Sequence, residues 1–216
     1  MNNSLHIREY IKKDTPHYAN SFIDINPKKT ALVLIDLWNS QELTDLVCNK
    51  INPIIKIARE KGVLIIHSPS QDYENIHHDL DIHPNDLLIT GYDDFGRELI
   101  NKEIDTLLYA GFDTLFCVLD KPLGAINNYF RTFEGSGYRY ILIRDSTSSE
   151  CKETYDLGIN LFEKLFRLTT TVLDICNFFN VRLSNVSTST DIAFTSCSNK
   201  KNIIKSNRVS SIYTDN

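Results

Sequence analysis

Residues 104–119 read IDTLLYAGFDTLFCVL, a stretch in which a continuous apolar run ends at Gly111 and leads through a short turn to Cys117. An apolar run without alternating polar residues is typical of a parallel strand that is covered by helices on both faces. Apolar residues then recur at helical spacing from Leu119 to Phe133. The segment therefore predicts a strand, a turn and a helix, which is the repeating unit of a parallel α/β sheet.

Further buried strands are expected on either side of this unit, at 31–35, 63–66, 86–90, 138–143 and 168–173. Helical spacing of apolar residues separates most of them, and strands that alternate with helices imply right-handed crossovers. We predict a three-layer α/β/α sandwich with a mostly parallel, roughly six-stranded sheet. Ligands bind at the carboxyl ends of the strands in such sheets, and those ends carry Asp36, His67, Gly111 and Asp145.

The chain divides into three parts by composition. Residues 1–28 are polar with scattered apolar side chains, and we expect an arm that wraps the domain without contributing a core element. Residues 29–180 form the predicted α/β domain. Residues 181–216 are rich in Ser, Asn and Lys, which is typical of a mobile tail.

Composition limits the classes of function. A net charge of −5 argues against nucleic acid as the main partner, and no apolar run is long enough to span a membrane. The first ten residues hold no signal-peptide core, so we expect a cytoplasmic protein. Five cysteines without a C-x-x-C pair make a disulfide framework or a structural zinc site improbable. No Gly-rich phosphate loop is present, and we expect no cofactor.

Two segments resemble the isochorismatase-like cysteine hydrolases. Residues 29–36, KTALVLID, resemble the family's first strand, which ends in a catalytic aspartate. Residues 104–119 resemble its nucleophile turn, in which an apolar strand is followed by Gly, two residues, Thr, two residues and Cys-Val. The resemblance extends over roughly residues 29–175, with Gly124 and Asp145 continuing the pattern, and it implies the same α/β fold.

The resemblance also implies a mechanism, in which Cys117 attacks an amide or related carbon and Asp36 acts as general base. The backbone N–H groups of Asp113 and Cys117 would form an oxyanion hole. The peptide bond between Phe112 and Asp113 corresponds to one that is often cis in the family. A helix that begins at the cysteine would favour its thiolate. The expected lining of the substrate pocket is Trp38, His67, Phe112 and Lys121.

Two positions depart from the family pattern. Gly91 stands where the family carries a lysine, and Leu115 stands where Asn or Asp is common. Without a cation the thiolate and the carboxylate repel each other, which raises the pKa of the cysteine. Lys121 is a possible substitute if it folds back over the site, but an exposed lysine on a helix surface is the favoured interpretation.

Histidines raise the question of a metal, because nicotinamidases of this superfamily hold one through an aspartate and histidines near the second strand. His77, His78 and His83 lie in the corresponding region, but the D-x-H arrangement is absent from residues 37–60. We interpret these histidines as part of a solvated polar loop and predict no metal.

The leading hypothesis is an amidase-like hydrolase whose small-molecule substrate is an amide, a carbamoyl compound or a vinyl ether. The alternative is a catalytically degenerate relative that binds small molecules or serves as a scaffold, as Gly91 and Leu115 suggest. A redox-active thiol protein is a third class, and it would need a second cysteine close to Cys117. By analogy with the family we expect a homo-oligomer, either a dimer or a tetramer.

Overall fold

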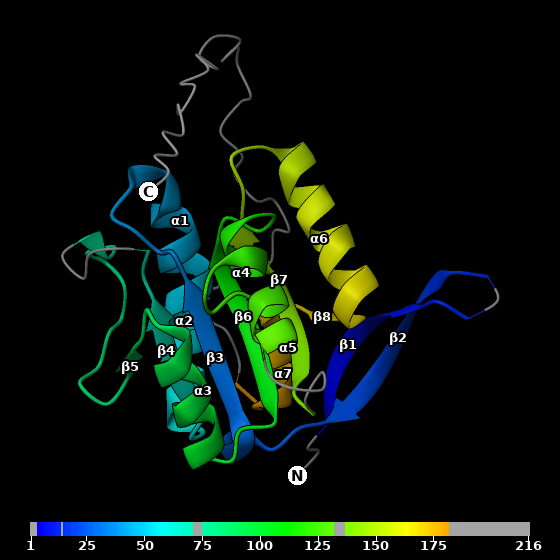
Figure 1. The fold of residues 1–216 in the computed structure, drawn as a ribbon, viewed down its shortest axis with the longest axis horizontal. Helices are drawn as coiled ribbons and strands as arrows, with labels where there is room; N and C mark the ends of the chain where they lie inside the picture. Colours follow the sequence, from blue (N-terminus) through cyan, green and yellow to red (C-terminus); the bar gives the residue numbers. More distant parts are fainter. Residues whose placement is uncertain (1–3, 14, 71–74, 132–136, 182–216) are drawn as a thin grey trace, which may run out of the picture.

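The computed structural model describes residues 4–13, 15–70, 75–131 and 137–181. Figure 1 shows the arrangement of its elements. The strands are β1 (Ser4–Ile11), β2 (His17–Asp24), β3 (Thr30–Ile35), β4 (Leu64–Ser68), β5 (Leu87–Leu88), β6 (Thr106–Phe112), β7 (Arg139–Ser148) and β8 (Leu168–Thr170). The helices are η1 (Pro27–Lys29), η2 (Gln41–Leu43), α1 (Thr44–Leu46), η3 (Val47–Ile51), α2 (Asn52–Glu60), α3 (Tyr92–Asn101), α4 (Cys117–Asp120), α5 (Ala125–Arg131), α6 (Lys152–Phe166) and α7 (Val172–Phe178).

One sheet runs through the molecule in the order β2-β1-β8-β7-β6-β3-β4-β5. The neighbours from β8 to β5 are all parallel, and they correspond to the six strands that the sequence predicted. Because β3 and β6 are adjacent at the centre, the residues that follow them meet at the same edge of the sheet. The α/β fold with a mostly parallel sheet is therefore confirmed, although the strand count is eight.

The two additional strands come from the predicted N-terminal arm, and the expectation that this arm adds no core element is wrong. β1 and β2 form an antiparallel hairpin, and β1 also pairs antiparallel with β8. Leu5 and Ile7 alternate with polar residues along β1, and both are fully buried. This is the period of a strand with one covered face, so the apolar side chains of the arm are part of the core.

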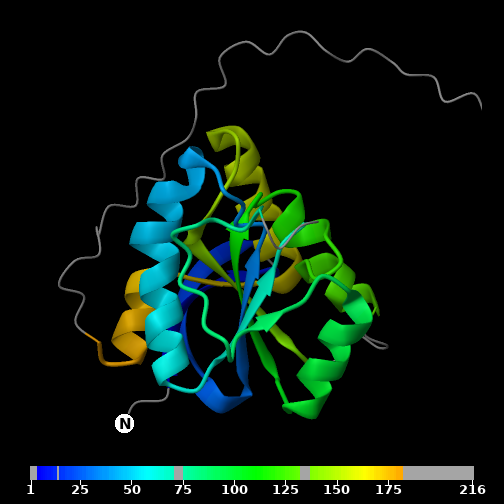
Figure 2. The same cartoon turned by 90° about the vertical axis from the view of Figure 1, so that its left-hand side faces the viewer.

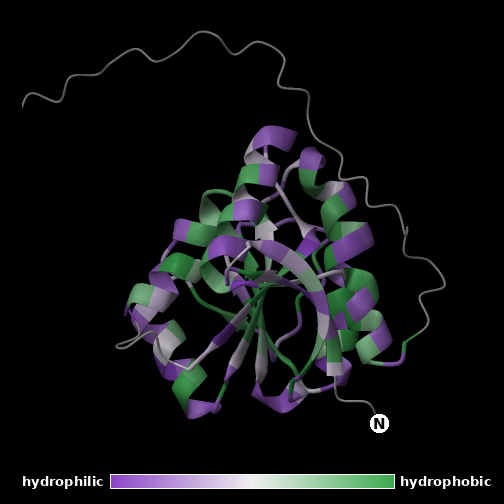
Figure 3. Cartoon of the chain, turned by 90° about the vertical axis from the view of Figure 1, so that its right-hand side faces the viewer, coloured by the Kyte–Doolittle hydropathy of each residue, from purple (hydrophilic) through white to green (hydrophobic). Residues whose placement is uncertain are grey.

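Helices cover both faces of the sheet, and Figure 2 shows the three layers edge-on. One core lies between the sheet and η3, α2 and α7, and it takes alternate strand residues such as Leu32 and Leu34. The other lies beneath α3, α4, α5 and α6 and takes Ala31, Val33 and Ile35. Both faces of β3 are thus buried, which explains its uninterrupted apolar sequence. In Figure 3 hydrophobic residues concentrate in the interior.

The last predicted strand is shorter than expected, because β8 ends at Thr170 and a helix follows at once. Thr171 is the N-cap of α7, and its hydroxyl accepts a hydrogen bond from the backbone N–H of Asp174 at 3.2 Å. This capping ends the strand within the predicted range 168–173. The predicted tail, 181–216, lies outside the described residues except for Val181. None of the described helices is long and apolar enough to cross a membrane.

Candidate active site

Asp36 follows β3 directly and is almost completely buried. Its φ is 50°, in the left-handed region that aspartate tolerates better than most residues. Its backbone N–H donates to the carbonyl oxygen of Ser68, at the end of β4, at 3.0 Å. The backbone of Asp36 is therefore held by β3, which it follows, and by β4, to which it is hydrogen-bonded. The carboxylate thus lies at the carboxyl edge of the sheet.

Gly111 brings the nucleophile turn close to Asp36. It pairs with Ile35 in the sheet and has a φ of 125°, which side-chain-bearing residues rarely adopt. A Cβ atom at this position would lie 2.0 Å from the carbonyl oxygen of Ile35. Only glycine allows the end of β6 to approach β3 this closely, so the glycine of the sequence motif positions the turn.

The nucleophile turn is held by the side chain of Asp113. The Phe112–Asp113 peptide bond is cis, as the resemblance implied. Oδ1 of Asp113 accepts hydrogen bonds from the backbone N–H of Leu115 at 2.8 Å and from the hydroxyl of Ser149 at 2.8 Å. The turn ends at Cys117, the first residue of the short helix α4. These bonds fix the backbone on which the sulfur is carried.

Lys121 places a positive charge next to Asp36. Its ammonium group forms an ion pair with Oδ2 of Asp36, in contact but not in hydrogen-bond geometry. It also donates to the hydroxyl of Ser70, which in turn donates to Oδ1 of Asp36. The Lys121 side chain is 24% exposed, so the favoured interpretation of an exposed surface lysine is wrong.

The position where the family carries its lysine has a different role in this chain. Gly91 is the N-cap of α3, and its carbonyl oxygen accepts from the backbone N–H of Phe95 at 3.2 Å. Lys121 instead follows α4, four residues after Cys117, and reaches Asp36 from the nucleophile's own segment. The positive charge thus enters the site from another element.

The environment of Cys117 favours the neutral thiol. Burial raises its pKa to about 11, and the Asp36 side chain raises it as well, both as a hydrogen-bond acceptor and through its charge. A hydrogen bond from the backbone of Asp113 and the Lys121 ammonium act in the opposite direction. β3 and β6 are adjacent in the sheet, and the turn that follows β6 leads to Cys117, so the thiol and the Asp36 carboxylate lie at the same edge of the sheet. In this arrangement the carboxylate can accept the thiol proton.

Trp38 and Phe112 stand at the ends of β3 and β6 and pack against each other. Their ring centroids are 4.7 Å apart in an edge-to-face arrangement, and both side chains are half-buried. Trp38 is also bridged through its backbone to Ile76. Two of the four residues that the sequence assigned to the substrate pocket thus lie next to the strand ends that carry Asp36 and the turn before Cys117.

His67, the remaining predicted pocket residue, belongs to a different network. It is in register with Leu34, whose side chain lies in the core beneath α2, whereas Cys117 packs against the opposite core. Its Nε2 hydrogen-bonds Oδ2 of Asp86 at 3.2 Å, and Asp86 is paired with Arg59 at 2.7 Å. Burial lowers the pKa of His67. These contacts connect the His67 ring to Asp86 and not to Cys117.

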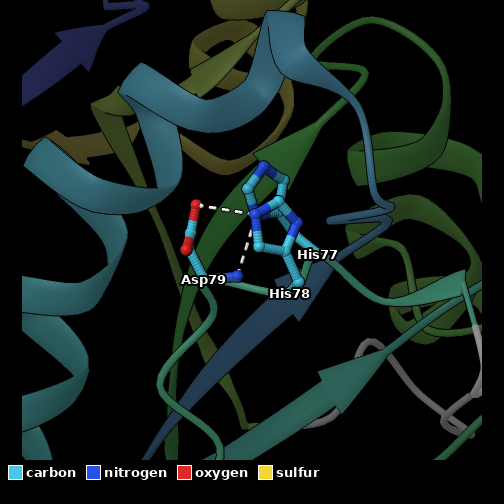
Figure 4. Close-up of side chains that lie close together, drawn as sticks. All are labelled: His77, His78 and Asp79. Atoms are coloured by element: carbon cyan, nitrogen blue, oxygen red, sulfur yellow. Dashed lines mark hydrogen bonds and ion pairs between the residues drawn. The ribbon is translucent and has the colours of Figure 1, made fainter.

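The histidines of the predicted polar loop are not all exposed to solvent. Figure 4 shows His77, His78 and Asp79 with their side chains together, and one ligand atom of each lies within 4.8 Å of the others. His77 is buried, so the expectation of full solvation is wrong for it. Its Nδ1 accepts from the backbone N–H of Asp79 at 3.2 Å, and its Nε2 lies 3.2 Å from the carbonyl oxygen of Ser40. Both ring nitrogens are thus engaged within the protein, and the absence of a metal remains a prediction.

Sequence reasoning missed Ser70 and Ser149 as members of the site. Ser70 follows β4 by two residues, so its place after a predicted strand was a weak signal for it. Ser149 had no such signal, because it reaches Asp113 across 36 positions of the chain. Its role depends on the pairing of β6 with β7.

Comparisons with known proteins give matches in structure only. No family model matches the sequence, and no curated protein matches it. A cysteine hydrolase from Pseudomonas syringae pv. phaseolicola 1448A superposes with a TM-score of 0.57 at 14% identity, over 72% of this chain and 94% of that one. An isochorismatase-like hydrolase from Alkaliphilus metalliredigens gives 0.56 at 16%, over 69% and 97%. An isochorismatase family protein from Burkholderia thailandensis gives 0.57 at 17%, over 73% and 98%.

These similarities extend over most of each solved structure, and they support the predicted fold. At this level of identity they establish the fold alone, and the chemistry has to be inferred from the residues of the site. The protein has the isochorismatase-like hydrolase fold.

Proposed function

We propose that the protein is a cysteine hydrolase that cleaves a small-molecule amide or a related C–N or ether bond. Cys117 is the nucleophile, Asp36 the general base and Lys121 the cation that balances their charges. The observation that carries this proposal is the ion pair of Lys121 with Asp36 beside the Cys117 thiol. A buried carboxylate next to a thiol would be unfavourable without a counter-charge.

In the proposed first step, Asp36 accepts the thiol proton while Sγ of Cys117 forms a bond to the carbonyl carbon of an amide. The carbonyl oxygen becomes an oxyanion, which receives hydrogen bonds from the backbone N–H groups of Asp113 and Cys117. When the C–N bond breaks, the leaving nitrogen takes the proton from Asp36, and a thioester remains on Cys117. The high pKa of the free thiol is compatible with this order, because the proton leaves only as the bond to carbon forms.

In the second step, Asp36 removes a proton from water, and the resulting hydroxide attacks the thioester. The sulfur leaves as a thiolate and regains the proton, so one water is consumed and an acid and an amine are released. Lys121 stays paired with Asp36 while the carboxylate carries its charge. Trp38 and Phe112, which pack edge to face at the strand ends, favour a flat or apolar substrate group at this site.

A small-amide library screened for amine or ammonia release tests the proposal. The wild-type protein should release amine from at least one member, and Cys117→Ala should not. Cys151→Ala is the matched control, because Cys151 is a buried thiol that pairs with Thr154 at 3.4 Å and has no place in the mechanism. Equal release by wild type and Cys117→Ala would rule out Cys117 as the nucleophile.

The alternative is a catalytically degenerate relative that binds a small molecule without cleaving it. The pKa of about 11 for Cys117 favours this alternative, because little thiolate is present at neutral pH. It predicts that the library contains ligands that raise the thermal stability of wild type and of Cys117→Ala equally, with no turnover of any member. We place the hydrolase first, because a binding protein has no need of a paired base and cation beside a thiol.

A further inference from the structure

A cavity lies away from the site of Cys117 and Asp36. Its volume is about 380 Å³, which is within the range of small-molecule sites. It is formed beneath α6, whose contacts reach β1, β7 and β8, and Figure 1 shows this helix along that side of the sheet. Its lining residues are Arg8, Arg144, Asp145, Tyr155, Asp156, Ile159, Asn160 and Thr171.

Arg144 is the residue of this cavity whose guanidinium has an unused buried donor among the described residues. Within the described ranges of the chain, no carboxylate forms an ion pair with its guanidinium. Its Nε is buried and has no hydrogen-bond partner there. Burial lowers the pKa of Arg144, and the neighbouring charge of Arg8 lowers it further. A buried donor of this kind is costly unless a ligand supplies the missing acceptor.

The acidic residues of the cavity are already engaged. Oδ1 of Asp145 accepts a hydrogen bond from the backbone N–H of Val172 at 2.9 Å, which holds the start of α7. Oδ2 of Asp156 pairs with Nζ of Lys152 at 2.5 Å, one turn earlier on α6. Neither carboxylate forms an ion pair with Arg144, and the charges of Glu163 and Asp145 act on its guanidinium only from a distance.

Two more donors face the same space. Arg8 binds Glu163 through Nε at 2.8 Å and through Nη2, which leaves Nη1 without an acceptor among the described residues. Asn160 accepts from the hydroxyl of Tyr18 at 3.3 Å through its amide oxygen, so its NH₂ group remains a donor. Two guanidinium groups and an amide nitrogen thus surround one cavity, and guanidinium groups match the geometry of carboxylate and phosphate oxygens.

We propose that this cavity binds a small molecule bearing an oxyanion, either a carboxylate or a phosphate, with Arg144 as the principal ligand-binding residue and Arg8 and Asn160 as further donors. The ligand would fill the hydrogen-bonding capacity that Arg144 lacks within the chain. The proposal does not depend on the reaction at Cys117, since none of the residues assigned to that reaction lines the cavity.

Isothermal titration calorimetry at constant ionic strength tests this, with sodium phosphate and sodium succinate as probes and sodium chloride as the reference salt. Wild type should show saturable binding of at least one probe with a 1:1 stoichiometry. Binding of phosphate alone identifies a phosphate site, and binding of succinate alone identifies a carboxylate site. Arg144→Met should weaken binding by about tenfold or more, the loss expected for a charge-assisted hydrogen bond.

Two controls keep the result interpretable. Arg97→Met removes an exposed arginine of α3 that pairs with Asp94, and it should leave binding unchanged. Asn160→Asp places a negative charge at an exposed position of the cavity rim and should weaken binding even if Arg144→Met does not fold. Failure of both probes to bind wild type, or equal binding by wild type and Asn160→Asp, would overturn the proposal.

Discussion

Asp36→Asn separates the charge of the proposed base from its shape, because asparagine is nearly isosteric with aspartate. In the wild-type protein burial is the largest cause that raises the pKa of Cys117 from 9.0 to about 11, and Asp36 adds to it by accepting a hydrogen bond and by its charge. The substitution removes the charge and leaves Lys121, which lowers the pKa, without its buried counter-ion. We therefore expect the pKa of Cys117 to fall, and burial should keep it above 9.0.

The rate of Cys117 alkylation by iodoacetamide as a function of pH measures this shift. Peptide mass spectrometry separates Cys117 from the other cysteines, and exposed Cys48 serves as the internal reference. A fall of about one pKa unit would make alkylation near neutral pH about tenfold faster. Hydrolysis should be lost in the same variant, so the thiol becomes more reactive while the enzyme becomes inactive.

Asp94→Asn is the matched control for this experiment, because it removes an exposed carboxylate of α3 that pairs with Arg97. It should leave the alkylation profile of Cys117 unchanged. A midpoint in Asp36→Asn that equals or exceeds the wild-type value would refute the placement of the carboxylate beside the sulfur.

Four further predictions concern the same fold and site. Lys121→Met should raise the pKa of Cys117 and, by leaving a buried carboxylate unpaired, lower the free energy of unfolding by about 3 kcal/mol; unchanged alkylation and urea profiles would contradict this. Gly111→Ala should lower the free energy of unfolding in urea by about 3 kcal/mol or more, because its Cβ would overlap the main chain of β3. A urea midpoint equal to that of wild type would contradict the close approach of β6 to β3. Leu5→Ala should cost about 3 kcal/mol if the hairpin is part of the core, and a loss below about 0.5 kcal/mol would place it outside the core. Burial lowers the pKa of His67 below 6.5, so on acidification the unfolded chain takes up a proton on this ring before the folded chain does, and the free energy of unfolding falls as the pH drops below that value. His67→Gln should make the plot of unfolding free energy against pH flatter in that range, and an unaltered slope would show that His67 is not the cause.

Much of the fold could be predicted from the sequence, because strands that are buried on both faces carry continuous apolar runs. β3 and β6 were recognised on this basis, and the alternation of strands and helices predicts that they run parallel. Their adjacency is a finding of the structure, because alternation does not determine the order of the strands. The hairpin of β1 and β2 was missed because its apolar residues alternate with polar ones over a short span. The pattern is weak in a single sequence, and pairing with β8, distant in the chain, is what buries Leu5 and Ile7.

The candidate site could be predicted from the sequence only in part. Asp36 and Cys117 stand at strand ends that a parallel sheet brings together, so their positions in the sequence were sufficient to suggest them. The position of the Lys121 ammonium group depends on the direction in which the chain leaves α4, and no local sequence pattern predicts that direction. His67 shows the opposite error, because position at a strand end does not say on which face a side chain lies. Its register with Leu34 directs it to the other side of the sheet.

The central claim is that Cys117 is an activated nucleophile, and its acylation by p-nitrophenyl acetate tests this most directly. We predict that wild type releases p-nitrophenol faster than Cys117→Ala does, with any trapped acetyl group located on Cys117 by peptide mass spectrometry. Equal release by wild type and Cys117→Ala, or acetylation confined to other residues, would contradict the account.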